Sequence, residues 1–384
     1  MNTEFIYLDH AAATPLDERV LHSMAPYFTT SFYNPSSPYS PAISVRRDYE
    51  EAKHTIAKQI GAKPDELVMT AGATESINLA FGSITGHVVT AAIEHQSVLA
   101  AAKSHDHTIV GVDHRGYVDP ESIRAAIQSD TELISIALAN NELGTIQPLR
   151  DIAQIVKQVR DDRLAAGDLT PLYFHSDASQ GVGQLDVNVA RLGLDMVTIN
   201  AAKIYGPKQV GLLWAASHVI LSPQIVGGGQ ERGLRSGTEN VAGTIGFAKA
   251  IELATAHRNF ESDRLRTLRD SFQTRLKEAF PEAVFSGHEK HRLAGHLHVS
   301  FPGIDGERLL FSLENRGVLV ATGSACAANK GTRSHVLTAI GLEPEVADGS
   351  IRISLGHLST PENIEQAGTI LIEEVTKEYA RIAQ

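Results

Sequence analysis

The sequence has a single cysteine, Cys326, among its 384 residues. One cysteine cannot form a disulfide within the chain, which excludes a disulfide-stapled domain and favours a reducing, cytoplasmic setting. The 17 histidines are scattered, and the sequence has neither a Cys-x-x-Cys pair nor a His-Glu-x-x-His motif. We therefore expect no metal site.

Long apolar runs and basic clusters are absent as well. No stretch approaches the roughly 18 apolar residues of a membrane span, and residues 1–5 lack the basic start and apolar stretch of a signal peptide. The net charge of −11, with no cluster of Lys and Arg, disfavours binding to phosphate backbones. We expect neither a membrane nor a nucleic acid as a partner.

The pattern that remains is that of an α/β protein. Short β-branched runs alternate with segments of helical period through about the first 250 residues, as in parallel sheets with crossover helices. We predict seven strands, at residues 67–70, 87–90, 108–110, 133–138, 172–175, 196–199 and 210–214. The predicted helices include residues 42–60, 75–81, 120–127 and 152–159, and residues 161–168 are predicted to be a solvated extension.

The pattern changes after about residue 255, as expected for a second, smaller domain. The predicted elements there are a charged helix at 260–280, a strand at 297–301, a helix at 307–315, a strand at 350–355 and a helix at 361–382. We therefore predict a mainly parallel seven-stranded sheet with helices on both faces, plus a smaller α+β domain. The predicted large domain is residues 15–255, and the predicted small domain is residues 1–14 and 256–384.

The lone cysteine lies in a run of small residues, 321–331. Such a run cannot fix its backbone by packing, so we expect a mobile loop that carries one thiol. Free cysteines are usually buried, whereas reactive ones are partly exposed. Cys326 is therefore a candidate reactive residue, although single surface cysteines also occur by chance.

Two polar residues, Asp177 and Lys203, each follow a predicted strand. Both side chains are expected at the carboxyl edge of the sheet, where open α/β folds build their sites. A lysine there can form a Schiff base with pyridoxal phosphate, and an acid can keep the pyridine nitrogen protonated. Either residue alone could be a cap or a surface group.

Residues 70–75 follow a strand and open a helix, with small residues and a threonine. Free backbone N–H groups at a helix N-terminus suit an anion such as phosphate. A plain helix cap with a turn glycine would have a similar sequence.

Nine segments together carry a resemblance to a known family. They are residues 7–15, 72–76, 94–95, 140–144, 177–180, 203–208, 227–238, 323–326 and 350–356. In this order they resemble the cysteine desulfurases, which are fold-type I pyridoxal phosphate proteins of the class V aminotransferase superfamily. The resemblance spans nearly the whole chain, and the spacing after Cys326 is similar to that of the branch with a long, mobile cysteine loop.

The resemblance implies a role for each residue around the cofactor ring. Lys203 would hold pyridoxal 5'-phosphate and move protons at the substrate Cα. Asp177 would pair with the ring nitrogen, and Gln180 would hydrogen-bond the ring hydroxyl. His95 would stack on the ring and is the best candidate to take a thiol proton, although a helix-capping histidine is the alternative interpretation.

The resemblance also implies a phosphate site. Thr74 and the amide of Ala73 would bind the phosphate, and Thr238 would reach it across a dimer interface. Family members usually carry Ser-x-His before the lysine, whereas this sequence has Asn200, Ala201 and Ala202. We expect weaker cofactor binding unless Asn200 or a neighbouring group substitutes, and Asn200 is counted among the cofactor-binding residues.

The implied reaction converts L-cysteine to L-alanine. Asn141 and Arg352 would bind the substrate carboxylate, Arg352 as a planar fork. The sulfur would be carried as a persulfide on Cys326 and passed to an acceptor protein, either an iron–sulfur scaffold or a sulfur carrier such as one for tRNA thiolation. The implied assembly is a homodimer.

Two other functions stay open at this point. One is a selenocysteine lyase or another class V lyase or aminotransferase, for which Cys326 would be dispensable. The other is a weakly active homologue that acts mainly as a binding partner.

Overall fold

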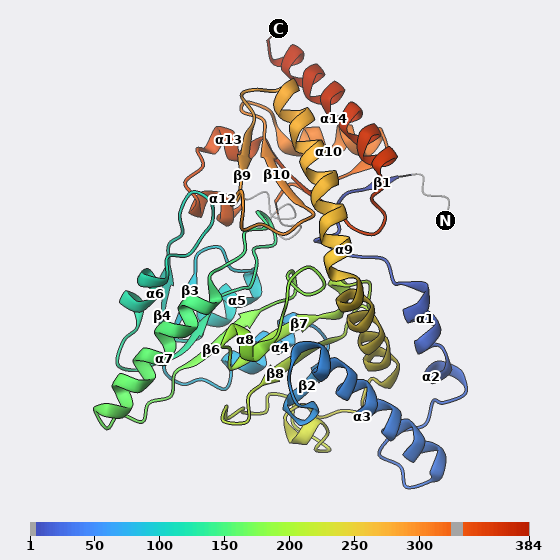
Figure 1. Ribbon diagram of the computed structural model, residues 1–384, viewed down its shortest axis with the longest axis vertical. Helices are drawn as coiled ribbons and strands as arrows, with labels where there is room; N and C mark the ends of the chain where they lie inside the picture. The colour runs from blue at the N-terminus through green and yellow to red at the C-terminus, as the bar shows by residue number, and fades with distance from the viewer. Residues whose placement is uncertain (1–4, 324–332, 384) are drawn as a thin grey trace.

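The computed structural model describes residues 5–323 and 333–383 (Figure 1). Cys326 lies outside the described residues. The strands are β1 (Ile6–Tyr7), β2 (Leu67–Thr70), β3 (His87–Ala91), β4 (His107–Val110), β5 (Thr131–Ser135), β6 (Tyr173–Asp177), β7 (Met196–Asn200), β8 (Gly211–Ala215), β9 (Val284–Ser286), β10 (His296–Ser300), β11 (Val318–Leu319) and β12 (Ser350–Ser354).

The helices include three short 3-10 turns, labelled η. They are α1 (Glu18–Met24), α2 (Pro26–Thr29), α3 (Ser40–Ile60), η1 (Pro64–Glu66), α4 (Ala73–Phe81), α5 (Gln96–Ala102), α6 (Pro120–Ala126), α7 (Leu149–Ala165), α8 (Val189–Leu192), η2 (Ala201–Lys203), η3 (Glu231–Gly233), α9 (Val241–Ala279), α10 (Gly306–Asn315), α12 (His335–Ala339), α13 (Pro344–Asp348) and α14 (Pro361–Ile382). No helix within the described part of the chain is long and apolar enough to cross a membrane.

The predicted seven-stranded, mainly parallel sheet is confirmed. Its strand order is β2-β8-β7-β6-β5-β3-β4, and β8 alone runs against the others. The reversal at β8 follows from its connection, because an antiparallel neighbour can be reached by a short loop without a crossover helix. That loop, between Asn200 and Gly211, carries Lys203. The carboxyl ends of β2, β3, β5, β6 and β7 therefore share one edge of the sheet.

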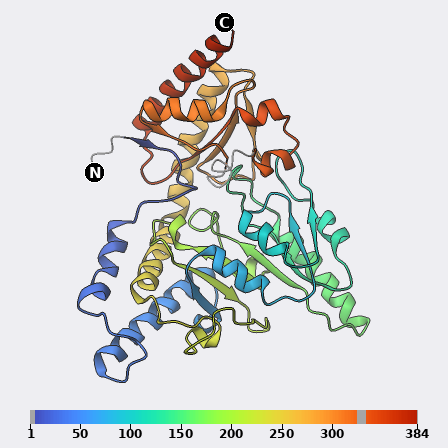
Figure 2. The ribbon, with the colours of Figure 1, turned by 180° about the vertical axis from the view of Figure 1, so that it is seen from behind.

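Helices cover both faces of this sheet (Figures 1 and 2). Neighbouring residues of one strand join different hydrophobic clusters: Val88 and Leu133 pack on the side of α4 and α5, whereas Val89 and Ile134 pack on the side of α3 and α7. Successive side chains of a strand point to opposite faces. Burial of both faces explains the continuous apolar runs from which the strands were predicted.

The predicted solvated extension at residues 161–168 is wrong for its first half, because α7 continues to Ala165. The charged residues support the helix: Lys157 pairs with Asp161 at 2.6 Å one turn later. The Arg163 guanidinium is buried and donates to the carbonyl oxygens of Thr131 and Pro171. These charges therefore extend a helix and anchor its end.

A second hydrophobic cluster lies in the C-terminal part of the chain. It joins the antiparallel sheet β12-β10-β9 to α10, α14 and the second half of α9, with Leu8 from the N-terminal segment. The 39-residue helix α9 contributes Ile251 to the first cluster and Leu265 to the second, so it connects the two units visible in Figure 1. The predicted domain boundary at residues 255 and 256 falls inside this helix and stays a prediction.

Candidate active site

A cavity of about 230 Å³, here called the front cavity, opens at the carboxyl edge of the large sheet. All predicted site residues except Cys326 and Thr238 line it: Ala73, Thr74, His95, Asn141, Asp177, Gln180, Asn200, Lys203 and Arg352. Most follow the carboxyl ends of parallel strands, which bring them together, whereas Arg352 comes from β12 of the other sheet.

The acid and the lysine are set by adjacent strands. Asp177 ends β6, and the amide of Ser179 donates to its Oδ1 at 2.9 Å, which orients the carboxylate. Lys203 ends the turn η2 after β7, the strand that pairs with β6. Its Nζ donates to the carbonyl oxygens of Ala11 at 2.8 Å and Ala12 at 2.7 Å. The N-terminal segment therefore lies directly against the lysine.

The start of α4 fits a phosphate. Gly72, the N-cap, has φ of +141°, a conformation that favours glycine, and a Cβ built there would meet no atom within 4 Å. Gly72 provides no side-chain cap, and the next two residues, Ala73 and Thr74, line the cavity, where the start of the helix suits an anion. Across the cavity, Asn200 accepts from the amide of Ala202 at 3.0 Å and also lines the wall.

His95 is both a helix cap and a cavity residue. It begins α5, and its Nδ1 accepts from the amide of Ser97 at 3.1 Å. Burial lowers the pKa of His95, against the opposing charge of Asp177. In the neutral ring the proton therefore sits on Nε2. Acceptance of a thiol proton by His95 would require the bond to Ser97 to break.

Arg352 is 2% exposed and is held from two sides. One terminal nitrogen donates to the carbonyl oxygen of Asn141 at 3.1 Å, and the other pairs with Asp9 Oδ1 at 2.6 Å. Its buried Nε has no partner among the described residues. Arg352 lines the cavity, and its planar guanidinium suits a substrate carboxylate.

Three acidic residues next to the predicted site residues, Asp9, Glu94 and Glu142, were given no role in the sequence analysis. Asp9 holds Arg352, and its partner lies 343 positions away in sequence. Burial raises the pKa of Glu94 to about 8, with the charge of Asp177 adding to the effect. Burial also raises the pKa of Glu142, against a hydrogen bond from Ser334. The only sequence signal was that all three stand in the segments that carry the family resemblance.

Thr238 does not reach the front cavity of its own chain. Its side chain is exposed, and its neighbours Gly237 and Glu239 line a separate cavity of about 170 Å³ together with Thr70 and Ala71.

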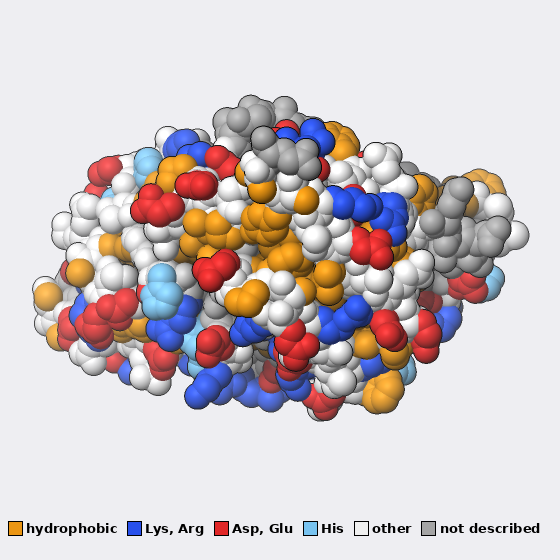
Figure 3. Space-filling model, turned by 90° about the horizontal axis from the view of Figure 1, so that it is seen from above, with side chains coloured by type: hydrophobic (Ala, Val, Ile, Leu, Met, Phe, Trp, Pro, Cys, Tyr) orange, Lys and Arg blue, Asp and Glu red, His pale blue; other side chains and the backbone are white. Residues whose placement is uncertain are grey.

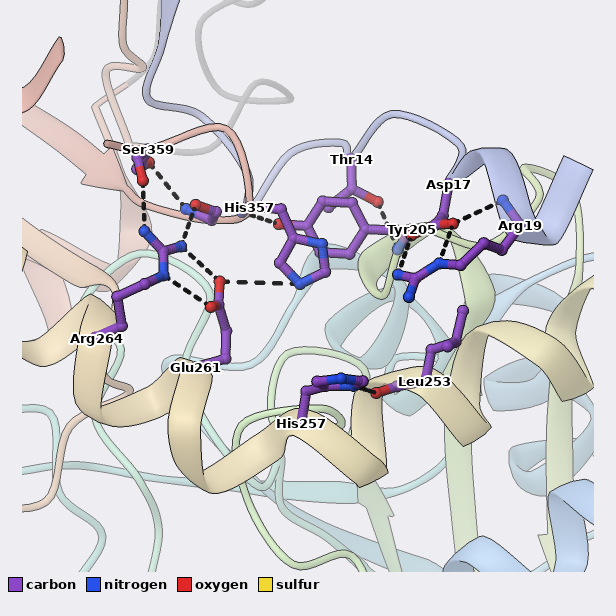
Figure 4. Close-up of polar contacts among 11 residues, drawn as sticks. Thr14, Asp17, Arg19, Tyr205, Leu253, His257, Glu261, Arg264, His357 and Ser359 are labelled. Carbon is purple, nitrogen blue, oxygen red and sulfur yellow. Dashed lines mark hydrogen bonds and ion pairs between the residues drawn. The ribbon is translucent and has the colours of Figure 1, made fainter. Parts of the chain in front are cut away.

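A smaller cavity of about 60 Å³, here called the rear cavity, lies on the other side of Lys203. Ala11, Gln180 and Lys203 line both cavities. Figure 4 shows one wall of the rear cavity, where the ring of His357 stacks on Tyr205 at 3.7 Å.

Beside that stack, Glu261 and Arg264 on α9 form an ion pair of 2.7 Å (Figure 4). Against the effect of burial, the hydrogen bonds from Arg264 lower the pKa of Glu261. Arg264 also donates to the carbonyl oxygens of Gly356 and Ser359. These contacts fasten the loop after β12 to the long helix.

No group of three or more His, Cys, Asp or Glu within residues 5–323 and 333–383 is arranged to hold a metal ion.

Comparison with known proteins decides the family. A family profile described as Aminotransferase class-V matches residues 6–367. The chain belongs to the class-V aminotransferase family. The cysteine desulfurases of this family depend on pyridoxal phosphate. The predicted family, fold and cofactor are therefore confirmed.

Three relatives show the extent of the similarity. The chain is 40% identical to "Cysteine desulfurase IscS" of Dictyoglomus turgidum, over 97% of this chain and 95% of the relative. A solved structure titled "NIFS-LIKE PROTEIN" has a TM-score of 0.89 and 33% identity, over 97% of this chain and 100% of the other. A structure titled "SspA in complex with cysteine" has a TM-score of 0.77 and 35% identity, over 91% and 98%.

Proposed function

We propose that this class-V aminotransferase family member is a cysteine desulfurase that converts L-cysteine to L-alanine. The observation that carries the proposal is the convergence of Lys203, Asp177, His95 and Arg352 on one cavity from four separate parts of the chain. The relatives named cysteine desulfurase, and the relative whose title includes cysteine, support the same substrate.

The front cavity has the donors and acceptors that pyridoxal phosphate requires. Lys203 would hold the cofactor, Asp177 would pair with its ring nitrogen and Gln180 with its hydroxyl, and the start of α4 would bind its phosphate. The bound cofactor supplies an electron sink for the substrate Cα.

The residues of the chain would then position cysteine and move its protons. Arg352 binds the substrate carboxylate, with Asn141 beside it, and Asp9 keeps the guanidinium in place. Lys203 removes the Cα proton and returns a proton later, as a general base and acid. His95 lies over the same cavity and offers its Nε2–H as a donor.

The sulfur transfer falls to Cys326. Its thiolate attacks the substrate sulfur, an S–S bond forms, and the substrate Cβ–S bond breaks with its electron pair left on the Cβ side. Protonation of Cβ completes alanine, and Cys326 keeps the sulfur as a persulfide. An ordinary thiol with a pKa near 8.5 supplies only a few per cent of thiolate at neutral pH, so a nearby base is needed.

A homodimer would complete the phosphate site. Thr238 is exposed and away from its own chain's front cavity, as required of a residue that serves a partner subunit. Large apolar side chains are exposed on the same part of the molecule, among them Phe28 (65%), Ile43 (58%) and Val226 (78%). An ion pair of 2.9 Å between Arg46 and Glu239 joins these segments. Their burial between two copies would be favourable.

The sulfur would pass to an acceptor protein, with iron–sulfur assembly and tRNA thiolation as the candidate pathways in a cytoplasmic setting. Figure 3 shows a face on which apolar side chains gather in the middle with charged side chains around them. A mixed surface of this kind suits a transient protein partner.

The proposed function is tested with purified protein and pyridoxal phosphate. With a thiol reductant present to release the persulfide sulfur as sulfide, we expect a visible absorbance band of bound cofactor, equal amounts of alanine and sulfide from cysteine, and loss of both products in Cys326→Ser. A coloured protein that makes no alanine from cysteine would refute the proposal. Alanine formation that survives in Cys326→Ser would favour a lyase mechanism instead.

A further inference from the structure

The start of α12 contacts two sides of the front cavity through its first residues. Ser334, its N-cap, donates to Glu142 at 2.6 Å, and Glu142 follows Asn141 directly in the chain. His335 bonds to the other side, at the start of α5. Neither Ser334 nor His335 is among the described residues that line the cavity.

His335 makes hydrogen bonds on both sides of His95. Its Nε2–H donates to the carbonyl oxygen of Glu94 at 2.9 Å, and its Nδ1 accepts from the side-chain amide of Gln96 at 3.1 Å. Because a carbonyl oxygen only accepts, Nε2 must carry the proton, and a neutral ring leaves Nδ1 as an acceptor. Both bonds are therefore satisfied by one neutral tautomer.

These contacts hold the turn of His95 from outside α5, whereas the His95 carbonyl oxygen accepts from amides of α5 itself, those of Val98 at 2.9 Å and Leu99 at 3.2 Å. The His95 ring is used for the cap on Ser97 and is exposed to the cavity. The preceding residue, Glu94, is held through its carboxylate by the amide of Ala137 at 3.0 Å. His335 adds two side-chain hydrogen bonds from α12 to this turn, one to each neighbour of His95.

We propose that His335 is a positioning residue for His95, fixing the height and tilt of the His95 ring over the cofactor. The proposal rests on the proposed function, in which His95 stacks on that cofactor. His335 has no contact with the cavity and acts through the residues on either side of His95.

The same helix start couples the two halves of the site. Ser334 reaches the acid that lies beside Arg352, and His335 reaches the turn of His95. A shift of α12 would therefore move the ring-stacking side and the substrate-carboxylate side together. Since misplacement by about 1 Å can lower a rate by as much as 10²-fold, such coupling has a measurable consequence.

The test compares His335→Leu, which removes both bonds, with His335→Gln, which keeps one donor and one acceptor. For the leucine variant we expect kcat to fall roughly tenfold with KM within about twofold, and a shifted absorbance band of the bound cofactor. The glutamine variant should recover kcat to within about threefold. His54→Leu, a change at an exposed histidine of α3, should match the wild type in every measurement.

A second readout does not need the cofactor. In the full chain without cofactor, hydrogen–deuterium exchange of residues 94–98 should be faster in His335→Leu than in the wild type. If that variant does not fold, Gln96→Ala removes the Nδ1 bond from an exposed residue and should give the same changes at smaller size.

The outcomes separate the two proposals. An active wild type with an unchanged His335→Leu spectrum and kcat would overturn the role of His335 alone. Ser334→Ala loosens the same helix start but leaves both His335 bonds; if it reproduces every effect, and glutamine gives no rescue at position 335, the role is merely structural. A wild type that makes no alanine from cysteine would instead overturn the proposed function.

Discussion

The front cavity, of about 230 Å³, and the rear cavity, of about 60 Å³, share Lys203 as a wall and differ in their polar groups. In the front cavity, the Arg352 guanidinium and the start of α4, at Ala73 and Thr74, line the wall as donors that suit an anion. In the rear cavity, Glu261 and Arg264 satisfy each other, and His357 is stacked on Tyr205.

The difference suggests separate roles for the two cavities around Lys203: the front cavity serves the reaction, and the rear cavity serves stability. A guanidinium and a helix start that line the same cavity suit an anionic ligand. Polar groups that are paired with one another hold two elements together. We therefore expect changes at the front to affect activity, and changes at the rear to affect mainly the free energy of unfolding.

The largest effect is expected at the shared wall. Lys203→Ala should lower kcat by about 10³-fold or more, because it removes the proposed general base and the proposed covalent anchor of the cofactor. Steady-state alanine formation measures the loss. Lys249→Ala is the control, at a partly exposed position of α9 outside both cavities, and should keep full activity. An alanine variant at position 203 that turns over normally would show that the front cavity is not the reaction site.

The next effect is an acid sensitivity from the rear cavity. Burial lowers the pKa of His10 to about 4, below its ordinary value of 6.5. Between these values the unfolded chain binds a proton at His10 that the folded chain does not, so the contribution of His10 to the free energy of unfolding falls as pH falls, by about 3 kcal/mol. In urea unfolding between pH 6.5 and 4, His10→Asn should make the fall in the free energy of unfolding smaller by the share of His10.

His54→Asn serves as the matched control for His10, since His54 is exposed. It should leave the slope unchanged. If His10→Asn and the wild type lose stability equally over this pH range, His10 does not contribute to it.

A smaller effect is expected at the substrate side of the front cavity. Arg352→Lys loses the planar fork and should raise KM for cysteine by roughly 10- to 100-fold, since charged hydrogen bonds contribute about 1.5–3 kcal/mol. The absorbance of the bound cofactor should stay unchanged, because the proposed role of Arg352 is to bind the substrate carboxylate. An altered absorbance with normal KM would assign Arg352 to the cofactor.

The smallest effect is expected at the rear ion pair. Glu261→Gln should lower the free energy of unfolding by about 0.5–1 kcal/mol, as for partly exposed pairs, with kcat within about twofold of the wild type. Chemical denaturation and alanine formation give the two numbers. A strong loss of kcat without loss of stability would mean that the rear cavity also takes part in catalysis.

The sequence predicted the elements whose pattern is local. Strand β2 and helix α14 have the predicted bounds, because the apolar pattern of each is bordered by clear turn or capping residues. The first half of α9 was missed. It contains Gly243 and Gly246, which disfavour helices, but close packing requires them, since a Cβ at Gly246 would collide with Met24.

The same distinction applies to the site. Asp177 and Lys203 could be predicted, because each follows its own strand and parallel strands share an edge. The ion pair between Asp9 and Arg352 and the hydrogen bonds of His335 to the turn of His95 could not be predicted. Both depend on segments more than 200 positions apart that meet only after the two units pack.

The most direct test is the mass of the Cys326 peptide after incubation of the cofactor-loaded protein with cysteine, for the wild type and Lys203→Ala. The account predicts one added sulfur on Cys326 in the wild type, removed by reductant, and none in Lys203→Ala. Unmodified Cys326 in a wild type that releases alanine, or equal modification in both proteins, would contradict it.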